Sequence, residues 1–310
     1  FPSDNLNDVK EFIEKINPLL VIFVKYDFWF NTLQELSRRS VPFAFVSMSL
    51  HQNSYLRKSW ANKFLNILRE ACLLSVQDQN SYDFLKSKGF DNILLAGDGR
   101  IDRIISLGEE SFHNEFIDKF CGESPILVIG SSWTQDLEIL KKAIQSSAFE
   151  NWKIIIAPHK VDDPHINECK TFFGSGINLY SRGIQSLSGV SRVLVIDCIG
   201  LLATLYRKAT LAYVGGGFGK GIHNILEPIA FGVPVCFGPQ HKKFREAQIF
   251  MDQKFGFEIR KAEDLIKIAI KCKEAGWQDE KKVDIQQFLQ NQKGSTERIM
   301  TYLEQHKFLK

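Results

Sequence analysis

The chain has 310 residues, 44% hydrophobic and 24% charged, which is typical of a folded globular protein long enough for two domains. Its 39 basic and 36 acidic residues leave a net charge of +3, which does not indicate a nucleic-acid-binding surface. The sequence has no apolar stretch of 18 residues or more, so no membrane-spanning segment is predicted. Six cysteines without any CxxC spacing favour reduced thiols: Cys72, Cys121, Cys169, Cys198, Cys236 and Cys272.

In the first third of the chain, apolar runs of strand length alternate with amphipathic helical patterns. Strands are predicted at 19–24, 43–48, 72–76 and 93–95, with helices at 29–39, 55–70 and 81–88. A polar stretch from about 97 to 125 interrupts this rhythm, so we place a first domain at 1–105 and a linker at 106–124. Only four strands precede the boundary, and the first residue is Phe1 rather than Met. We therefore expect the first domain to be incomplete.

The same alternation resumes in a second domain, predicted at 125–290. Strands are predicted at 126–129, 153–157, 193–196, 211–214 and 233–237, a helix at 137–146, and only helices after about 261. The last segment, 291–310, is expected to form a helix that packs back on the first domain. Buried, unalternating strands between helices predict two doubly wound α/β domains with parallel sheets. Such domains bind ligands at the carboxyl ends of their strands.

A glycine run, GGGFGKG, follows the apolar stretch that ends at Val214. Its spacing fits neither the dinucleotide fingerprint nor the P-loop, because Lys220 is followed by Gly221 instead of Ser or Thr. Glycines without Cβ atoms are expected to leave N–H groups free for a ligand. Helical spacing predicts a helix that starts near His223, and the N-terminus of a helix favours a bound phosphate. Glu227 would lie one turn later, where its carboxylate can accept hydrogen bonds from ribose hydroxyls. This pattern predicts a nucleotide-sugar site. The alternative is a tight turn with close helix–strand packing.

Other strand ends carry polar groups that suit the same ligand. Ser131 and Ser132 follow one strand and predict a second phosphate position, although an ordinary helix N-cap explains them equally well. His159 ends the next strand, and its alternative is a solvated loop. Gly200 follows a third strand and could border a nucleobase, or simply form a turn.

Three residues of the first domain are possible acceptor or sugar contacts: Lys25, Asp27 and Arg100. The alternatives are a solvated turn for the first two and a surface pair with Asp98 or Asp102 for Arg100. No metal site is expected, because the spacing of four histidines resembles no zinc or iron pattern: His159, His165, His223 and His241.

Taken in order, the segments NPLLVIFVKYDFWFN, GDGRIDRI, GSSWTQDLEIL, IIIAPHK, VIDCIGLLATLY and GGGFGKGIHNILEP resemble the 3-deoxy-D-manno-octulosonic acid (Kdo) transferases of lipid A biosynthesis. GVPVCFGP and KFREA extend the resemblance, which covers nearly the whole chain. It implies a GT-B fold with two Rossmann-like domains facing a cleft. It also implies CMP-Kdo as donor, a lipid A precursor as acceptor, and peripheral attachment to the cytoplasmic face of the bacterial inner membrane.

Carried over by position, the resemblance implies that Asn224 meets the donor's phosphate and Glu227 its ribose. Gly200 would lie near the cytosine, and His159 takes a place often held by arginine. The full set of expected donor contacts is Ser131, Ser132, His159, Ile199, Gly200, Gly216, Gly217, Gly219, Lys220, Gly221, His223, Asn224 and Glu227.

The resemblance also shows departures. It places the family's catalytic carboxylate and an N-terminal anchor upstream of Phe1, so no catalytic residue is assigned and the fragment alone is expected to be inactive. Lys25 stands where many members have glutamate. An inverting transfer without metal or cofactor is expected for the complete protein. The alternatives are another GT-B enzyme using a UDP-sugar, such as an epimerase or N-acetylglucosaminyl transferase, and a non-catalytic nucleotide-binding protein.

Overall fold

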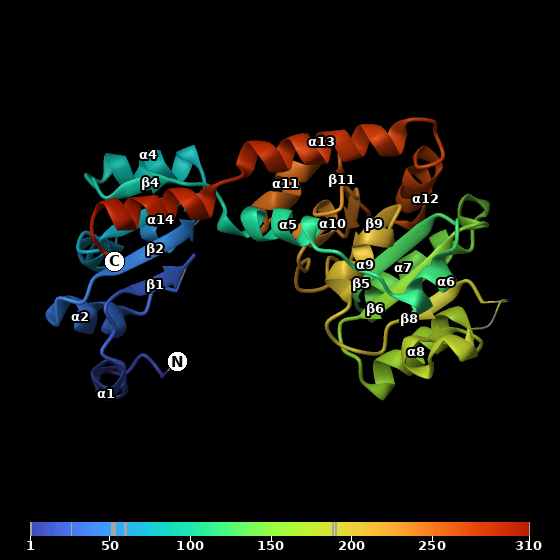
Figure 1. The fold of residues 1–310 in the computed structure, drawn as a ribbon, viewed down its shortest axis with the longest axis horizontal. Coiled ribbons are helices and arrows are strands. Elements are labelled where there is room, and N and C mark those ends of the chain that lie inside the picture. Colours follow the sequence, from blue (N-terminus) through green and yellow to red (C-terminus); the bar gives the residue numbers. More distant parts are fainter. Residues whose placement is uncertain are drawn as a thin grey trace. The chain divides into compact units, whose positions relative to one another are not determined.

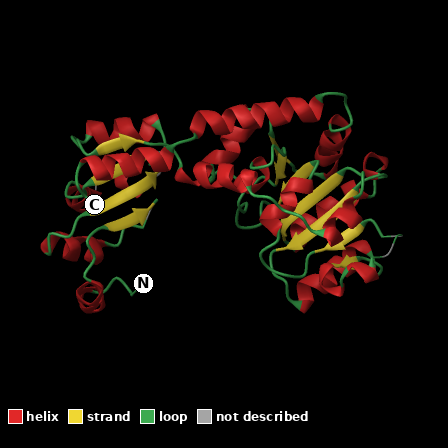
Figure 2. Ribbon diagram, in the orientation of Figure 1, coloured by secondary structure: helices red, strands yellow, loops and turns green. Residues whose placement is uncertain are grey.

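The structure is a computed structural model that describes residues 2–25, 27–50, 54–58, 61–187, 189 and 191–309. The chain forms two compact α/β units (Figure 1). Unit 1 consists of Phe1–Arg103 and Gln292–Lys310, and unit 2 of Ile104–Asn291. In each unit, helices flank a sheet whose strands are all parallel (Figure 2). This confirms the predicted fold class, two Rossmann-like α/β units.

Unit 1 contains a four-stranded sheet of order β1-β2-β3-β4. Its strands are β1 (Val21–Val24), β2 (Phe43–Met48), β3 (Leu73–Val76) and β4 (Ile93–Leu95), all at predicted positions. Its helices are α1 (Leu6–Ile16), α2 (Phe30–Arg38), α3 (Asn62–Leu68), α4 (Gln79–Ser87) and the start of α5 (Gly99–Glu109). Stacked and edge-on phenylalanine rings from β1 and β2 pack in the core of the unit. The ring centres of Phe23 and Phe45 are 4.9 Å apart. β1 is an edge strand that leaves Ile22 and Val24 about half exposed.

The C-terminal helix α14 (Ser295–Gln305) belongs to unit 1. Its Ile299 and Leu303 form a small apolar cluster with residues of β2, β3 and the chain after β4. The carboxylate of Asp102 accepts hydrogen bonds from the backbone N–H groups of Gly294 (2.7 Å) and Thr296 (2.6 Å). Those bonds satisfy donors at the start of the helix that would otherwise lack a partner.

Unit 2 contains a seven-stranded sheet of order β11-β10-β9-β5-β6-β8-β7. Its strands are β5 (Ile126–Ser132), β6 (Lys153–Pro158), β7 (Asn178–Leu179), β8 (Val193–Val195), β9 (Leu211–Val214), β10 (Val235–Phe237) and β11 (Gly256–Glu258). Its helices are α6 (Glu115–Cys121), α7 (Thr134–Ile144), α8 (Asp163–Phe173), α9 (Leu202–Leu205), α10 (Leu226–Ile229), α11 (Arg245–Asp252), α12 (Ala262–Lys271) and α13 (Trp277–Gln292). The edge strands β7 and β11 are absent from the sequence prediction, because neither has an apolar run of strand length.

The stretch expected to be a linker, 106–124, is helical and packed. It contains the end of α5 and the whole of α6, whose Phe116, Ile117 and Phe120 are buried. Gly108 packs so closely on the end of α10 that a Cβ there would stand 2.5 Å from the carbonyl oxygen of Ala230. These residues therefore form part of the second unit.

Within the described ranges no helix is long and apolar enough to cross a membrane. Cys121, Cys169 and Cys236 are buried, whereas Cys72, Cys198 and Cys272 are only partly buried.

Candidate functional site

The sheet of unit 2 has a topological switch point between β5 and β9. From β5 the chain passes to β6 on one side, and it later returns as β9 on the other. Helices therefore lie on opposite faces on the two sides of this point, and the carboxyl ends of β5 and β9 are where such sheets bind ligands. Three segments meet there: 130–136 after β5, 158–160 after β6, and 214–227 after β9.

The carboxyl end of β5 carries a bulge. The β5–β6 register shifts between Gly130 and Ser132, and Ser131 has φ 52°, in the left-handed region that is costly for serine. The bulge is fixed by a hydrogen bond of 3.0 Å from the N–H of His159 to the carbonyl of Ser132. Ser132 is 1% exposed, and its hydroxyl has no hydrogen-bond partner within the described part of the chain. A buried hydroxyl without a partner is uncommon and needs a reason.

Asp136 in α7 is the buried anchor of the site. Its carboxylate accepts the N–H of Trp133 (2.9 Å), the N–H of Gly216 (2.9 Å) and the hydroxyl of Tyr213 (2.8 Å). Burial raises its pKa, and these three bonds partly offset that effect. Asp136 therefore joins the start of α7 to the glycine loop after β9. The sequence does show an acidic residue at the third position of the helix that begins at the end of GSSWT. Asp136 was nevertheless not among the predicted site residues.

The glycine loop is held mainly by contacts within the protein. The N–H of Gly215 donates to Gly130 (2.8 Å) and that of Gly219 to Gly216 (3.0 Å), while the N–H of Gly216 is held by Asp136. The expectation that these glycines leave their N–H groups free is therefore wrong for all three.

Close packing explains why glycines stand at these positions. A Cβ on Gly215 would lie 2.4 Å from the carbonyl oxygen of Ser131, and one on Gly217 would lie 2.6 Å from the backbone of Gly238. Gly216 has φ +91° and Gly221 has φ +139°, conformations that other residues rarely adopt. The tight-turn alternative thus accounts for much of the motif.

The helix after this loop begins later than predicted. α10 starts at Leu226, so His223 and Asn224 lie in the loop before it, and Glu227 is not one helical turn beyond His223. The N–H of His223 donates to Gly215 (3.1 Å), and the Asn224 side chain accepts the N–H of Leu226 (3.2 Å). Such local side-chain bonds compete with helix formation and here cap the start of a short helix.

Asn224 and Glu227 nevertheless lie together. The Asn224 side-chain amide donates to the Glu227 carboxylate at 2.9 Å. Burial raises the pKa of Glu227, and the bond from Asn224 lowers it in part. Tyr206, fully buried, has its phenol oxygen 2.0 Å from where a Cβ on Gly130 would stand, which requires glycine there. Tyr206 was not among the predicted site residues.

Three aromatic rings form a stack at the same strand ends. Trp133 lies on His159 with ring centres 4.3 Å apart, and His159 lies on His223 at 4.5 Å. The Trp133 indole N–H also donates to Nε2 of His223 at 3.0 Å. Burial lowers the pKa of both histidines, and Lys160 lowers that of His159 further. Both shifts favour the neutral form of the rings.

The remaining predicted donor contacts lie on exposed loops. Ile199 is 88% exposed, and Gly200 has φ +97° with open space where a Cβ would stand. Gly219 and Lys220 are also exposed, at the tip of the glycine loop. The predicted roles of these residues toward a ligand stay predictions. Among the described residues, no group of three or more His, Cys, Asp or Glu side chains is placed to hold a metal ion.

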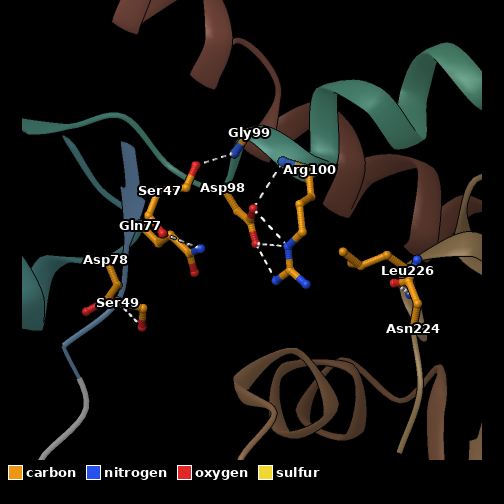
Figure 3. A network of polar contacts seen from close by, with 9 residues as sticks. All are labelled: Ser47, Ser49, Gln77, Asp78, Asp98, Gly99, Arg100, Asn224 and Leu226. Atoms are coloured by element: carbon orange, nitrogen blue, oxygen red, sulfur yellow. Dashed lines mark hydrogen bonds and ion pairs between the residues drawn. The ribbon is translucent and has the colours of Figure 1, made fainter. Parts of the chain in front are cut away.

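The predicted contacts of the first domain lie in unit 1. Lys25 directly follows β1 with φ 62°, and Asp27 is exposed. The Arg100 guanidinium pairs with the Asp98 carboxylate at 2.6 Å (Figure 3), and both side chains are partly buried rather than at the open surface. Their roles toward an acceptor also stay predictions.

Comparison with known proteins shows which family the chain resembles. Residues 1–103 match the model of the 3-deoxy-D-manno-octulosonic-acid transferase (kdotransferase) family. The 3-deoxy-D-manno-octulosonic acid transferase of Aquifex aeolicus is 28% identical over 270 residues, covering 86% of this chain and 69% of that protein. A bifunctional glycosyltransferase/methyltransferase of Fusobacterium nucleatum is 24% identical over 320 residues, covering 100% of this chain and 47% of that protein.

Among solved structures, the UDP-GlcNAc 2-epimerase of Neisseria meningitidis matches with a TM-score of 0.62 at 12% identity, covering 97% of this chain and 80% of the other. This likeness concerns the fold, which is of the GT-B type found in glycosyltransferases and epimerases. By their descriptions, both relatives named above are glycosyltransferases. The match to the Kdo transferase family model covers residues 1–103 of this chain. The chain spans between about half and two thirds of the lengths of the two relatives named above.

Proposed function

We propose that unit 2 binds CMP-Kdo and that the complete protein transfers Kdo to a lipid A precursor in lipopolysaccharide inner-core biosynthesis. The match of residues 1–103 to the Kdo transferase family model supports Kdo as the transferred sugar. The observation that carries a ligand site in unit 2 is the buried Ser132 hydroxyl, which has no partner in the described chain although it lies at the β5–β9 switch point. A phosphate oxygen would supply the missing hydrogen bond.

The ribose is assigned to Glu227. Its side chain is partly buried beside the glycine loop and bonded to Asn224, which holds one carboxylate oxygen in place. A carboxylate with a remaining acceptor oxygen suits the paired hydroxyls of a ribose. The raised pKa of Glu227 shows that burial disfavours its charge, and donated hydrogen bonds from a ligand would relieve this cost.

The proposed transfer is inverting and needs no divalent metal. A carboxylate base, assigned to no residue of this chain, takes the proton of an acceptor hydroxyl. The hydroxyl oxygen bonds to the anomeric carbon of Kdo, and the bond from that carbon to the phosphate oxygen breaks, so CMP leaves with the electron pair. Lys220, His159 and His223 supply a cation and N–H donors for the leaving phosphate. Transfer by the complete protein should persist in EDTA, and loss of transfer there would contradict the metal-independent step.

Nucleotide binding is tested by calorimetry on the 310-residue chain. We expect CMP to bind more tightly than UDP, and a clear preference for UDP would contradict the Kdo-transferase function in favour of a UDP-sugar enzyme. Because Glu227 is assigned to the ribose, wild type should bind CMP roughly tenfold more tightly than 2′-deoxy-CMP. Glu227→Ala should abolish this difference.

The matched control is Glu263→Ala, which removes an exposed glutamate from the first turn of α12 in the same unit. It should retain the preference for CMP over the deoxy nucleotide. Equal affinity of wild type for the two nucleotides would refute the role of Glu227 while leaving CMP binding itself intact.

On the acceptor side, we propose that unit 1 lies at the cytoplasmic face of the inner membrane. Leu19 is 84% exposed, and Ile22 and Val24 of β1 are about half exposed, just before Lys25 and Asp27. Exposed apolar side chains in such a group favour contact with an apolar partner. Sedimentation with vesicles that contain anionic lipid tests this placement, and a chain that remains entirely in the supernatant would contradict it.

A further inference from the structure

The Trp133–His223 contact specifies a protonation state. A neutral imidazole carries one N–H donor and one acceptor nitrogen, and the nitrogen that accepts a hydrogen bond cannot carry the proton. The indole N–H of Trp133 donates to Nε2 of His223 at 3.0 Å. The proton of neutral His223 is therefore on Nδ1, which has no partner among the described residues.

The two rings are held by a common carboxylate. Asp136 accepts the backbone N–H of Trp133 and also that of Gly216. Gly216 in turn lies against the Nε2 edge of His223, because a Cβ at Gly216 would stand 3.0 Å from Cδ2 and 3.2 Å from Nε2. The Nε2 edge is thus enclosed by Trp133 and the glycine loop, so Nδ1 is the nitrogen left for a ligand.

We propose that Trp133 is a positioning residue that holds His223 as its Nδ1–H tautomer, so that His223 donates a hydrogen bond to a nucleotide phosphate as a neutral group. This inference rests on the proposed nucleotide site in unit 2. Burial and the His159 ring stacked on it at 4.5 Å lower the pKa of His223, whereas the Asp136 carboxylate raises it. Protonation of Nε2 would also break the bond from Trp133, so the indole opposes charging of His223.

The first test is a long-range ¹H–¹⁵N spectrum of the 310-residue chain, in which protonated and unprotonated imidazole nitrogens have distinct shifts. We expect His223 to show a protonated Nδ1 and an unprotonated Nε2 above its titration. An Nε2–H tautomer in wild type overturns the inference, and this result does not depend on whether any variant folds.

The second test is Trp133→Phe, which keeps an aromatic ring on His159 and removes the N–H donor. We expect both tautomers of His223 to be populated, its pKa to rise, and CMP affinity to fall about three- to tenfold, the effect of one neutral hydrogen bond. The control is His165→Phe, because His165 contacts the Trp133 ring edge-on at 6.3 Å without joining the hydrogen bond. It should leave the tautomer of His223 unchanged and CMP affinity within twofold of wild type.

The outcomes separate the two proposals. If His223 has the Nδ1–H tautomer in wild type and loses it in Trp133→Phe, but neither CMP nor inorganic phosphate binds, the proposed function fails while the role of Trp133 toward His223 holds. If CMP binds equally to wild type and Trp133→Phe and the tautomer is the same in both, the inference is overturned and the proposed function stands.

Discussion

Gly215→Ala is the sharpest test of how the site is built. A Cβ at this position would lie 2.4 Å from the carbonyl oxygen of Ser131, 2.8 Å from Oδ2 of Asp136 and 2.8 Å from Cα of Ser132. Two of these atoms belong to the backbone, and the third is fixed by hydrogen bonds, so moving any of them costs free energy. Overpacking of this kind costs about 1–3 kcal/mol, and displacing Asp136 from the N–H of Gly216 adds about 1.5–3 kcal/mol for a charged hydrogen bond. We expect a loss of about 3–5 kcal/mol in the free energy of unfolding.

Gly219→Ala is the matched control in the same loop. Its new Cβ would meet only the carbonyl oxygen of Gly216, at 3.6 Å, and the backbone there is not left-handed. Its stability should stay within about 1 kcal/mol of wild type. Urea unfolding, followed by circular dichroism and by tryptophan fluorescence, measures both variants. If the two variants lose the same free energy of unfolding, the loop can move to make room for the new Cβ, and Asp136 does not hold it in place.

Two further predictions concern unit 1. Glu35 is 2% exposed, and the hydrogen bond from Arg38, helped by Arg39, lowers its pKa from 4.5 to about 2. A lowered folded-state pKa contributes stability that is complete above the unfolded pKa and is lost as pH falls from about 4.5 toward 2. In Glu35→Gln the free energy of unfolding should therefore depend less on pH over that range. The control Glu11→Gln, at an exposed residue, should keep the pH dependence of wild type. If Glu35→Gln also keeps it, the role assigned to the Glu35 carboxylate is contradicted. Asp102→Ala removes the acceptor for the N–H groups of Gly294 and Thr296, so we expect a loss of about 1–2 kcal/mol and faster hydrogen exchange in α14. Asp91→Ala, at a 91% exposed residue, is its control, and equal exchange in the two variants would argue against the anchor.

Sequence patterns located the central elements because buried parallel strands are continuous apolar runs. All nine strands predicted from such runs are present, whereas β7 and β11 have no such run and were missed. The helix start was misplaced for a different reason. His223 and Glu227 have helical spacing, but the N–H of His223 is committed to Gly215 and Asn224 caps Leu226, so α10 begins at Leu226. Spacing cannot reveal which acceptor a backbone N–H will find across the chain.

Asp136 and Trp133 were missed as site residues for a related reason. An acidic residue at the third position of a helix has an ordinary capping role, and it fills that role here by accepting the N–H of Trp133. Its bonds to Gly216 and Tyr213 join segments about eighty residues away in sequence, and only the pairing of β5 with β9 brings them together. The residue type identified Asp136 as a hydrogen-bond acceptor, but its partners depended on the topology of the sheet.

The two units use one local device differently, and the difference argues for a ligand at unit 2. In unit 1 the register shifts between Phe45 and Met48 near the end of β2, and Ser47 has φ 56°; in unit 2 the same bulge occurs at Ser131 with φ 52°. The Ser47 hydroxyl accepts the N–H of Gly99 at 3.1 Å, which ties the bulge to the start of α5 (Figure 3). Beside the bulge of unit 2, the buried Ser132 hydroxyl has no such bond among the described residues. Both bulges carry the cost of a left-handed serine, but only in the first is the neighbouring serine hydroxyl bonded within the described chain. A bound ligand would supply the partner that the buried Ser132 hydroxyl lacks.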